Sequence, residues 1–135
     1  MGYAVFAQTE APVVPFDALR ANAKRYFRLE LSLLEQSGPS VLLGLDGETF
    51  RVMASPTTPD DLARAREAET AGSAAGMATL AERCRHVWRL ETDAPESATL
   101  RLAAILASVA LGPVLPPDGS TLFGVRGAME RAQKA

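Results

Sequence analysis

The hydrophobic pattern at the start of the chain predicts a strand, a helix and a second strand. Residues Tyr3 to Gln8 combine aromatic and β-branched side chains, as strands do. From Phe16 to Phe27 the apolar positions recur at spacings of three and four, which predicts an amphipathic helix. Leu29 to Leu34 then alternates leucine with polar residues, although leucine and glutamate also favour a helix that continues to Gln36. A helix would spread these leucines around its circumference, so we prefer a strand.

The middle of the chain predicts a β-hairpin followed by a helix. The dipeptide Asp46-Gly47 lies between two apolar alternating runs, Val41 to Leu45 and Glu48 to Ala54. It can adopt the positive φ values of a two-residue turn at little steric cost. The segment from Thr58 to Asp61 then supplies a capping hydroxyl, a proline for the first turn and two carboxylates for the positive end of the helix dipole. We expect this helix to reach about Ala71.

The rest of the chain continues to alternate helices with strands. On the strand predicted over Arg83–Glu91, Trp88 and Leu90 should face one side of the sheet and Val87 the other. This order of elements predicts an α+β fold, with an antiparallel or mixed sheet of about five strands and helices packed on one face. The remaining predicted elements are a helix over Ala74–Glu82, a strand over Arg83–Glu91, an apolar helix from Pro95 to Gly112, a short strand over Thr121–Val125 and a terminal helix over Ala128–Lys134.

Length and composition indicate a single domain over residues 1–135. The 14 basic and 16 acidic residues give a formal charge of −2, so the basic excess of nucleic-acid-binding proteins is missing and we expect no nucleic-acid partner. One cysteine excludes an internal disulfide. We find no targeting signal and no apolar run long enough to cross a bilayer, so we expect a cytoplasmic protein that does not associate with membranes.

Four sequence segments in a fixed order add a comparison. They are G-L-D-G-E-T-F-R-V in the hairpin, S-P-T-T-P-D-D-L at the helix start, C-R-H-V-W-R-L-E in the later strand and A-T-L-R-L-A-A-I-L-A in the apolar helix. Together they resemble a family of uncharacterised bacterial α+β domains over roughly residues 3 to 125. The resemblance implies the fold and a cytoplasmic location. Some members of the family resemble partners or immunity factors of secreted toxins, so the resemblance implies a role of this kind. It assigns no role to individual residues.

Any histidine chemistry must use His86, which is the only histidine of the chain. On the predicted strand Cys84, His86 and Trp88 would point to the same side, which allows a Cys–His nucleophile or two metal ligands. An activated thiol also needs an orienting third group, and a closed zinc site needs four ligands. We therefore expect these three side chains to pack in or beside the core.

The acidic residues have structural explanations of their own. Asp60 and Asp61 suit a helix start, Asp46 suits its turn, and Asp118 belongs to a Pro-Pro-Asp-Gly turn. An acid–base pair would also need a partner in a cleft. We expect no catalytic residue, no cofactor and no metal site. The alternative is a small enzyme that uses Cys84 or the acidic turn residues.

Arginines are the remaining candidates, because arginine is well suited to protein interfaces. The first predicted helix carries one basic patch, and the strand over Arg83–Glu91 carries another. We therefore predict a non-catalytic protein-binding module, for example an immunity factor or chaperone for a secreted toxin or effector, with Arg85 and Arg89 as the partner-binding residues. Two alternatives remain open: these arginines form an ordinary solvated surface, or the protein is a homo-oligomeric structural component. The first patch comprises Arg20, Lys24, Arg25 and Arg28.

Overall fold

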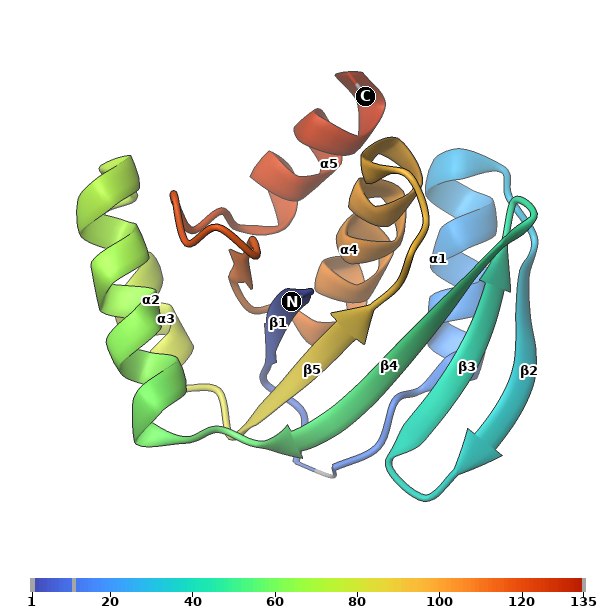
Figure 1. Cartoon of the computed structure of the whole chain (residues 1–135), viewed down its shortest axis with the longest axis horizontal. Helices are drawn as coiled ribbons and strands as arrows, with labels where there is room; N and C mark the ends of the chain where they lie inside the picture. Colours follow the sequence, from blue (N-terminus) through green and yellow to red (C-terminus); the bar gives the residue numbers. More distant parts are fainter. Residues whose placement is uncertain (1, 11, 135) are drawn as a thin grey trace.

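An antiparallel sheet of six strands organises the part of the chain that the computed structural model describes, residues 2–10 and 12–134 (Figure 1). The strand order is β2-β3-β4-β5-β1-β6, and every neighbouring pair is antiparallel. The predicted α+β class and antiparallel sheet are confirmed, with six strands rather than about five. The elements are β1 (Tyr3–Ala7), α1 (Phe16–Phe27), β2 (Leu31–Ser37), β3 (Ser40–Leu45), β4 (Glu48–Pro56), α2 (Pro59–Gly72), α3 (Met77–Glu82), β5 (His86–Glu91), α4 (Glu96–Ala110), β6 (Val114–Leu115) and α5 (Val125–Lys134).

The main hydrophobic core lies between one face of the sheet and the helices α1 and α4, with α5 packed against α4 (Figure 1). Because side chains alternate along a strand, every second strand residue, including Val5, Leu43 and Trp88, points into this core. Helix α4 is apolar nearly all round, and its residues 102 to 107 are all buried. A helix that is apolar on most sides must be covered on more than one side, and α4 contacts α1, α5 and β1.

A smaller core lies on the opposite face of the sheet. Ala4, Phe6 and Val87 point away from the main core and pack against α2 and α3 through residues such as Ala65 and Ala81. The helices therefore occupy both faces, whereas the sequence predicted helices on one face. The small core contains no residue of β2, β3 or β4. Helices α2 and α3 thus cover only the β5–β1–β6 end of this second face.

The ambiguous leucine segment forms a strand, as preferred. Arg28 ends α1 in the left-handed conformation (φ 56°), and its N–H donates to the Lys24 carbonyl over 3.0 Å. This turn reverses the chain, so that β2 begins at Leu31 and pairs with β3 as far as Ser37. The strand therefore starts two residues later and ends three residues later than predicted.

Both local signals in the middle of the chain have the expected geometry. Asp46 and Gly47 have φ values of 52° and 82°, as a tight hairpin turn requires. At the start of α2 the Thr58 hydroxyl accepts a hydrogen bond from the Asp61 N–H (3.1 Å), while the Asp61 carboxylate accepts one from the Thr58 N–H (2.9 Å). This reciprocal pair is a capping box, which satisfies two of the free N–H groups at the helix start.

Two predictions near the end of the chain were wrong in position. Strand β5 begins at His86 rather than Arg83. The last strand is Val114–Leu115, beside β1, and not Thr121–Val125. Phe123 forms only an isolated bridge with Val114, after which α5 begins. Within the described residues, no helix has both the length and the apolar character needed to cross a membrane.

Candidate functional site

Arg89, one of the two predicted partner-binding residues, is engaged within the fold. It lies on the sheet face that carries α2, and its guanidinium donates to both Asp61 carboxylate oxygens over 3.0 and 2.8 Å. Its Nε also donates to the Ser55 hydroxyl over 3.2 Å. The Asp61 side chain is only 8% exposed and the Arg89 side chain 37%. The pair therefore fastens the start of α2 to β5, and the three hydrogen bonds use three of the five N–H donors of the guanidinium.

The surroundings of Asp61 keep it ionised. Burial alone raises the pKa of the carboxyl, but hydrogen bonds from Arg89 and Thr58 outweigh burial and hold the pKa below its usual value. The carboxylate is thus a buried anion that both a guanidinium and a helix cap satisfy.

Arg85, the other predicted residue, is exposed but does not lie on a strand. It occupies the turn directly before β5, where its carbonyl accepts a hydrogen bond from the Thr57 N–H over 2.9 Å. The predicted strand over Arg83–Glu91, which was expected to carry Arg85 and Arg89 as one basic patch, begins only at His86. Arg85 and Arg89 do not belong to one row of strand side chains.

The Cys84 and His86 side chains lie on different faces of the sheet. Cys84 precedes β5, belongs to the small core with α2 and α3, and its thiol donates to the Leu80 carbonyl (3.4 Å). His86 lies opposite Ala7 on the main-core face, with Nδ1 3.0 Å from the Thr9 carbonyl oxygen. The expected common orientation is therefore wrong. Burial raises the pKa of the Cys84 thiol to about 11, so it is protonated at neutral pH and is a poor nucleophile.

The acidic turn residues lie in separate parts of the fold. Asp46 is in the β3–β4 turn, 3.9 Å from the Arg101 guanidinium, and Asp60 is exposed in the first turn of α2. Asp118 accepts a hydrogen bond from the Ser120 N–H over 3.0 Å, which lowers the pKa of its carboxyl. Among the residues that the structure describes, no group of three or more His, Cys, Asp or Glu side chains is arranged to hold a metal ion.

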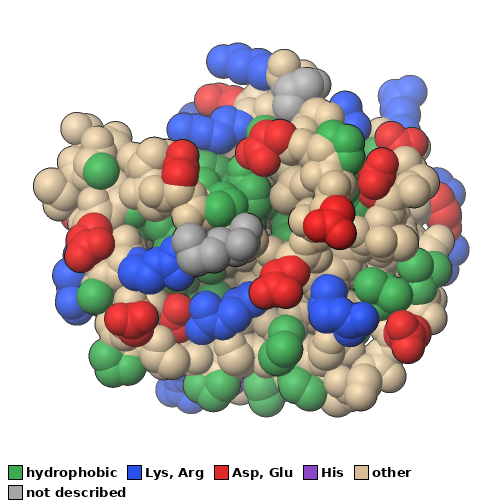
Figure 2. Space-filling view, viewed as in Figure 1, with side chains coloured by type: hydrophobic (Ala, Val, Ile, Leu, Met, Phe, Trp, Pro, Cys, Tyr) green, Lys and Arg blue, Asp and Glu red, His purple; other side chains and the backbone are tan. Residues whose placement is uncertain are grey.

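The outer side of β2, β3 and β4 contributes no residue to the smaller core, and we call it the open face. Figure 1 is viewed from this side, with α1 and α4 behind the sheet. Leu42 on β3 points outward opposite Arg51 on β4, and Arg51 in turn lies opposite Glu91 on β5. Met53, one pair further along β4, is 44% exposed. Figure 2 shows apolar, basic and acidic side chains intermixed on this side of the molecule.

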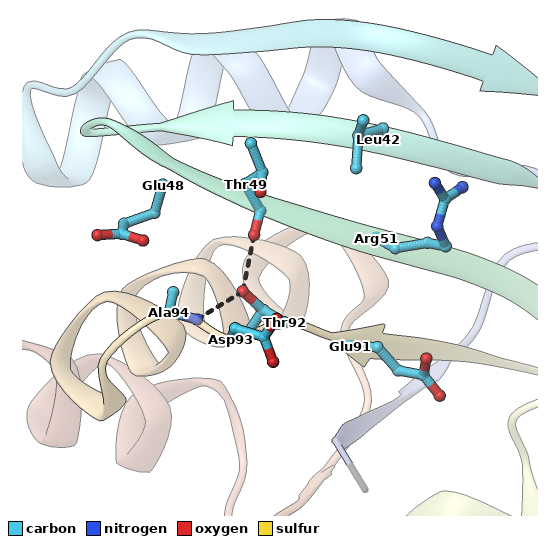
Figure 3. Close-up of a pocket in the computed structure, with 8 residues that line it drawn as sticks. All are labelled: Leu42, Glu48, Thr49, Arg51, Glu91, Thr92, Asp93 and Ala94. Atoms are coloured by element: carbon cyan, nitrogen blue, oxygen red, sulfur yellow. Dashed lines mark hydrogen bonds between the residues drawn. The ribbon is translucent and has the colours of Figure 1, made fainter.

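A hollow of about 520 Å³ opens on the open face beside the end of β5 (Figure 3). Its wall is fixed by Thr92, whose hydroxyl donates to the Thr49 carbonyl over 2.7 Å and accepts from the Ala94 N–H over 3.0 Å. Three carboxylates and one guanidinium line it, so its charge is negative. The lining residues are Leu42, Glu48, Thr49, Arg51, Glu91, Thr92, Asp93 and Ala94.

A second hollow of about 330 Å³ adjoins the first, since both are lined by Glu48 and Thr49. It extends toward the β3–β4 turn and adds the acidic residues Glu30 and Asp46 but no basic residue. The two hollows therefore bring several carboxylates to the turn end of the open face, beside Leu42 and Arg51. Of these carboxylates, Glu30 is paired with Arg20 over 3.0 Å and Asp46 lies 3.9 Å from Arg101.

A β-bulge in β2 places Leu34 on the open face. Leu33 pairs with Leu43 and Glu35 with Leu42, so Leu34 has no partner of its own in the ladder. Its side chain instead covers Gly44, since a Cβ atom on Gly44 would lie 3.4 Å from a Leu34 methyl carbon. Sequence reasoning did not identify the open face. Two signals for it were available: the Leu33-Leu34 pair interrupts the alternation, and Gly44 leaves a gap within a strand.

Comparisons with known proteins add no assignment. The chain matches no protein-family model, and searches of curated proteins and of solved structures found no significant match. The resemblance to uncharacterised bacterial α+β domains therefore stays a prediction.

Proposed function

We propose that the protein is a non-catalytic protein-binding module that contacts its partner through the open face. The observation that carries the proposal is the group of exposed apolar side chains on this uncovered half of the sheet. Leu34 on β2 is 50% exposed and Met53 on β4 is 44% exposed, whereas Leu43 on β3 and Val52 on β4, which point to the other side of the sheet, are fully buried. Apolar side chains within a polar rim are typical of protein-binding surfaces.

The polar residues of the open face suit an interface as well. Arg51 is exposed at the centre of the face and donates one hydrogen bond, to the Ser40 hydroxyl over 3.3 Å, which leaves most of its donors available to a partner. Arginine beside apolar residues is a frequent energetic centre of interfaces. Arg51 therefore takes the role that the sequence suggested for Arg89, while Arg85 stays an exposed secondary candidate.

The biological setting follows from the sequence resemblance alone. We propose a bacterial cytoplasmic protein that acts as an immunity factor or chaperone for a secreted toxin or effector. Such proteins bind a partner before it reaches its target, which requires a stable surface and no reaction chemistry. A fold in which Cys84 is buried and protonated and Asp61 is paired accords with this role.

Photocrosslinking in the native host tests the proposed surface. A photoreactive amino acid at Met53 should yield a discrete adduct with one protein, whereas the same amino acid at Glu67, exposed on α2, should not. Mass spectrometry identifies the adduct, and calorimetry with the purified partner then measures affinity. Met53→Asp should weaken binding about tenfold or more, and Glu67→Lys should change it less than about twofold. No adduct at Met53, or equal losses for both variants, would contradict the proposal.

A further inference from the structure

Strand β2 leaves one long edge of the sheet unpaired. It is the outermost strand, it spans seven residues, and only its first residue, Leu31, is buried. The other outermost strand, β6, has two residues, and Val114 within it already bridges to Phe123. Among the described residues, β2 is therefore the longer row of backbone N–H and C=O groups that another strand can pair with.

The bulge gives this edge apolar side chains on both faces. Leu33 lies on the main-core face opposite Leu43 and is 37% exposed. Leu34, the next residue, lies on the open face and is 50% exposed. A strand added beside β2 would therefore have side chains on one of its faces near Leu33 and side chains on its other face near Leu34. This arrangement favours a fully extended occupant over a helix.

The charge of the edge selects between possible occupants. Edge strands are commonly protected from pairing by lysine or proline, and β2 contains neither. Its only charged residue is Glu35. Glu48 lines the adjoining hollow as a second carboxylate, whereas the Glu30 carboxylate there is already paired with Arg20 over 3.0 Å. Two copies of the chain joined through β2 would bring these carboxylates into one interface, where like charges repel. A basic segment would be attracted instead.

We infer that the partner contributes an extended segment with lysine or arginine side chains, which adds to β2 as a seventh strand. The inference rests on the proposed protein-binding function and specifies the chemistry of the partner. Main-chain hydrogen bonds along β2 would supply affinity, and Glu35 on β2 together with Glu48 near the β3–β4 turn would select basic side chains.

A titration followed by NMR tests the inference with defined synthetic peptides. The probe is a seven-residue peptide of alternating lysine and valine, added to the isotope-labelled full chain. We expect saturable shifts of the β2 amide signals, with binding that weakens as ionic strength rises. A peptide with glutamate in place of lysine should bind about tenfold more weakly or not at all. Methylation of alternate backbone nitrogens in the lysine peptide should also abolish the β2 shifts.

A matched pair of variants separates edge charge from overall charge. Glu35→Lys should weaken the lysine peptide about fivefold, whereas Glu67→Lys on α2, with the same change in net charge, should have less than about a twofold effect. Both variants should give the circular dichroism spectrum of the wild-type protein, which checks that they are folded.

Each contrary result identifies which idea fails. Shifts confined to the Leu42 and Met53 side chains, with β2 amides unmoved, would overturn strand addition while leaving the open face as a binding surface. Equal binding of the glutamate peptide would overturn the basic partner. A dimer in sedimentation that depends on β2 would make a second copy the occupant. Absence of any peptide binding would overturn the inference, whereas the proposed function is judged by the crosslinking at Met53.

Discussion

Arg89 on β5 donates two hydrogen bonds to the carboxylate of Asp61, which at the same time caps α2. The pair joins the helix layer of the smaller core to the central strand of the sheet. The two residues are 28 positions apart in sequence. Their contact gives Arg89, which the sequence suggested as a binding residue, a role in holding the fold together.

Removal of Arg89 should destabilise the protein. Arg89→Ala leaves the Asp61 carboxylate buried without its main partner, and breaking such a pair costs several kcal/mol when both groups are buried. Because the Arg89 side chain is 37% exposed, we expect a smaller loss of unfolding free energy, about 1–3 kcal/mol. Urea unfolding measures this loss, and Arg85→Ala, at an exposed position, should stay within about 0.5 kcal/mol. Similar stability for both variants would show that Arg89 is not needed for folding, and partner binding would again be its expected role.

Stability should fall in acid partly because of Asp61. The pKa of this carboxyl is lower in the folded protein than in the unfolded chain, so the folded state favours the ionised form. Its contribution is complete above the unfolded pKa of about 4 and is lost as the pH falls through the lower folded value. Unfolding at a series of pH values should show a weaker acid dependence for Asp61→Asn than for wild type. Asp60→Asn, at the exposed neighbouring position of α2, is the matched control, and an unchanged profile for Asp61→Asn would contradict this account.

The Cys84 thiol should react slowly in the native protein. Burial raises its pKa to about 11, and the reactive thiolate is therefore scarce at neutral pH. Iodoacetamide at pH 8 should modify native Cys84 about a hundredfold more slowly than the urea-unfolded chain, as mass spectrometry can follow. Fast native alkylation would instead revive the alternative of a small enzyme with a Cys84 nucleophile.

Gly112 should not tolerate even one added carbon. A Cβ atom there would lie 1.9 Å from the Phe6 carbonyl oxygen, on the strand to which Pro113 also hydrogen-bonds. Gly112→Ala forces backbone to move, and we expect about 1–3 kcal/mol of destabilisation in thermal or urea unfolding. Gly124→Ala is the control, because its nearest contact, the Met77 sulfur at 3.6 Å, is ordinary. A neutral Gly112→Ala would show that β1 and this loop are less closely packed.

Signals confined to a few residues could be predicted from the sequence. The turn at Asp46-Gly47 and the cap at Thr58 depend on backbone conformation and on neighbours within three residues, and both were confirmed. The alternation that separates Trp88 and Leu90 from Val87 was confirmed for the same reason. Local propensity and periodicity contain all the information that these features need.

The candidate site depends on distant packing and could not be predicted in the same way. The orientation of Cys84 relative to His86 depends on the residue at which β5 begins. Because β5 begins at His86 and not at Arg83, Cys84 lies before the strand and does not follow the alternation of strand side chains. The open face exists because α2 and α3 cover only one end of the sheet. The position of these helices on the sheet cannot be predicted from a local sequence pattern. Arg51 appeared in the sequence as an ordinary hairpin residue for that reason.

The exposed apolar residues of the open face should contribute little to folding. Met53 is 44% exposed on β4, whereas Leu43 on the adjacent strand is fully buried on the other side of the sheet. Met53→Ala should therefore cost less than about 1 kcal/mol of unfolding free energy, and Leu43→Ala about 2–5 kcal/mol. Urea unfolding of both variants under one set of conditions makes the comparison. A large loss at Met53 would mean that this side chain serves the fold, and the open face would lose its strongest argument as a binding surface.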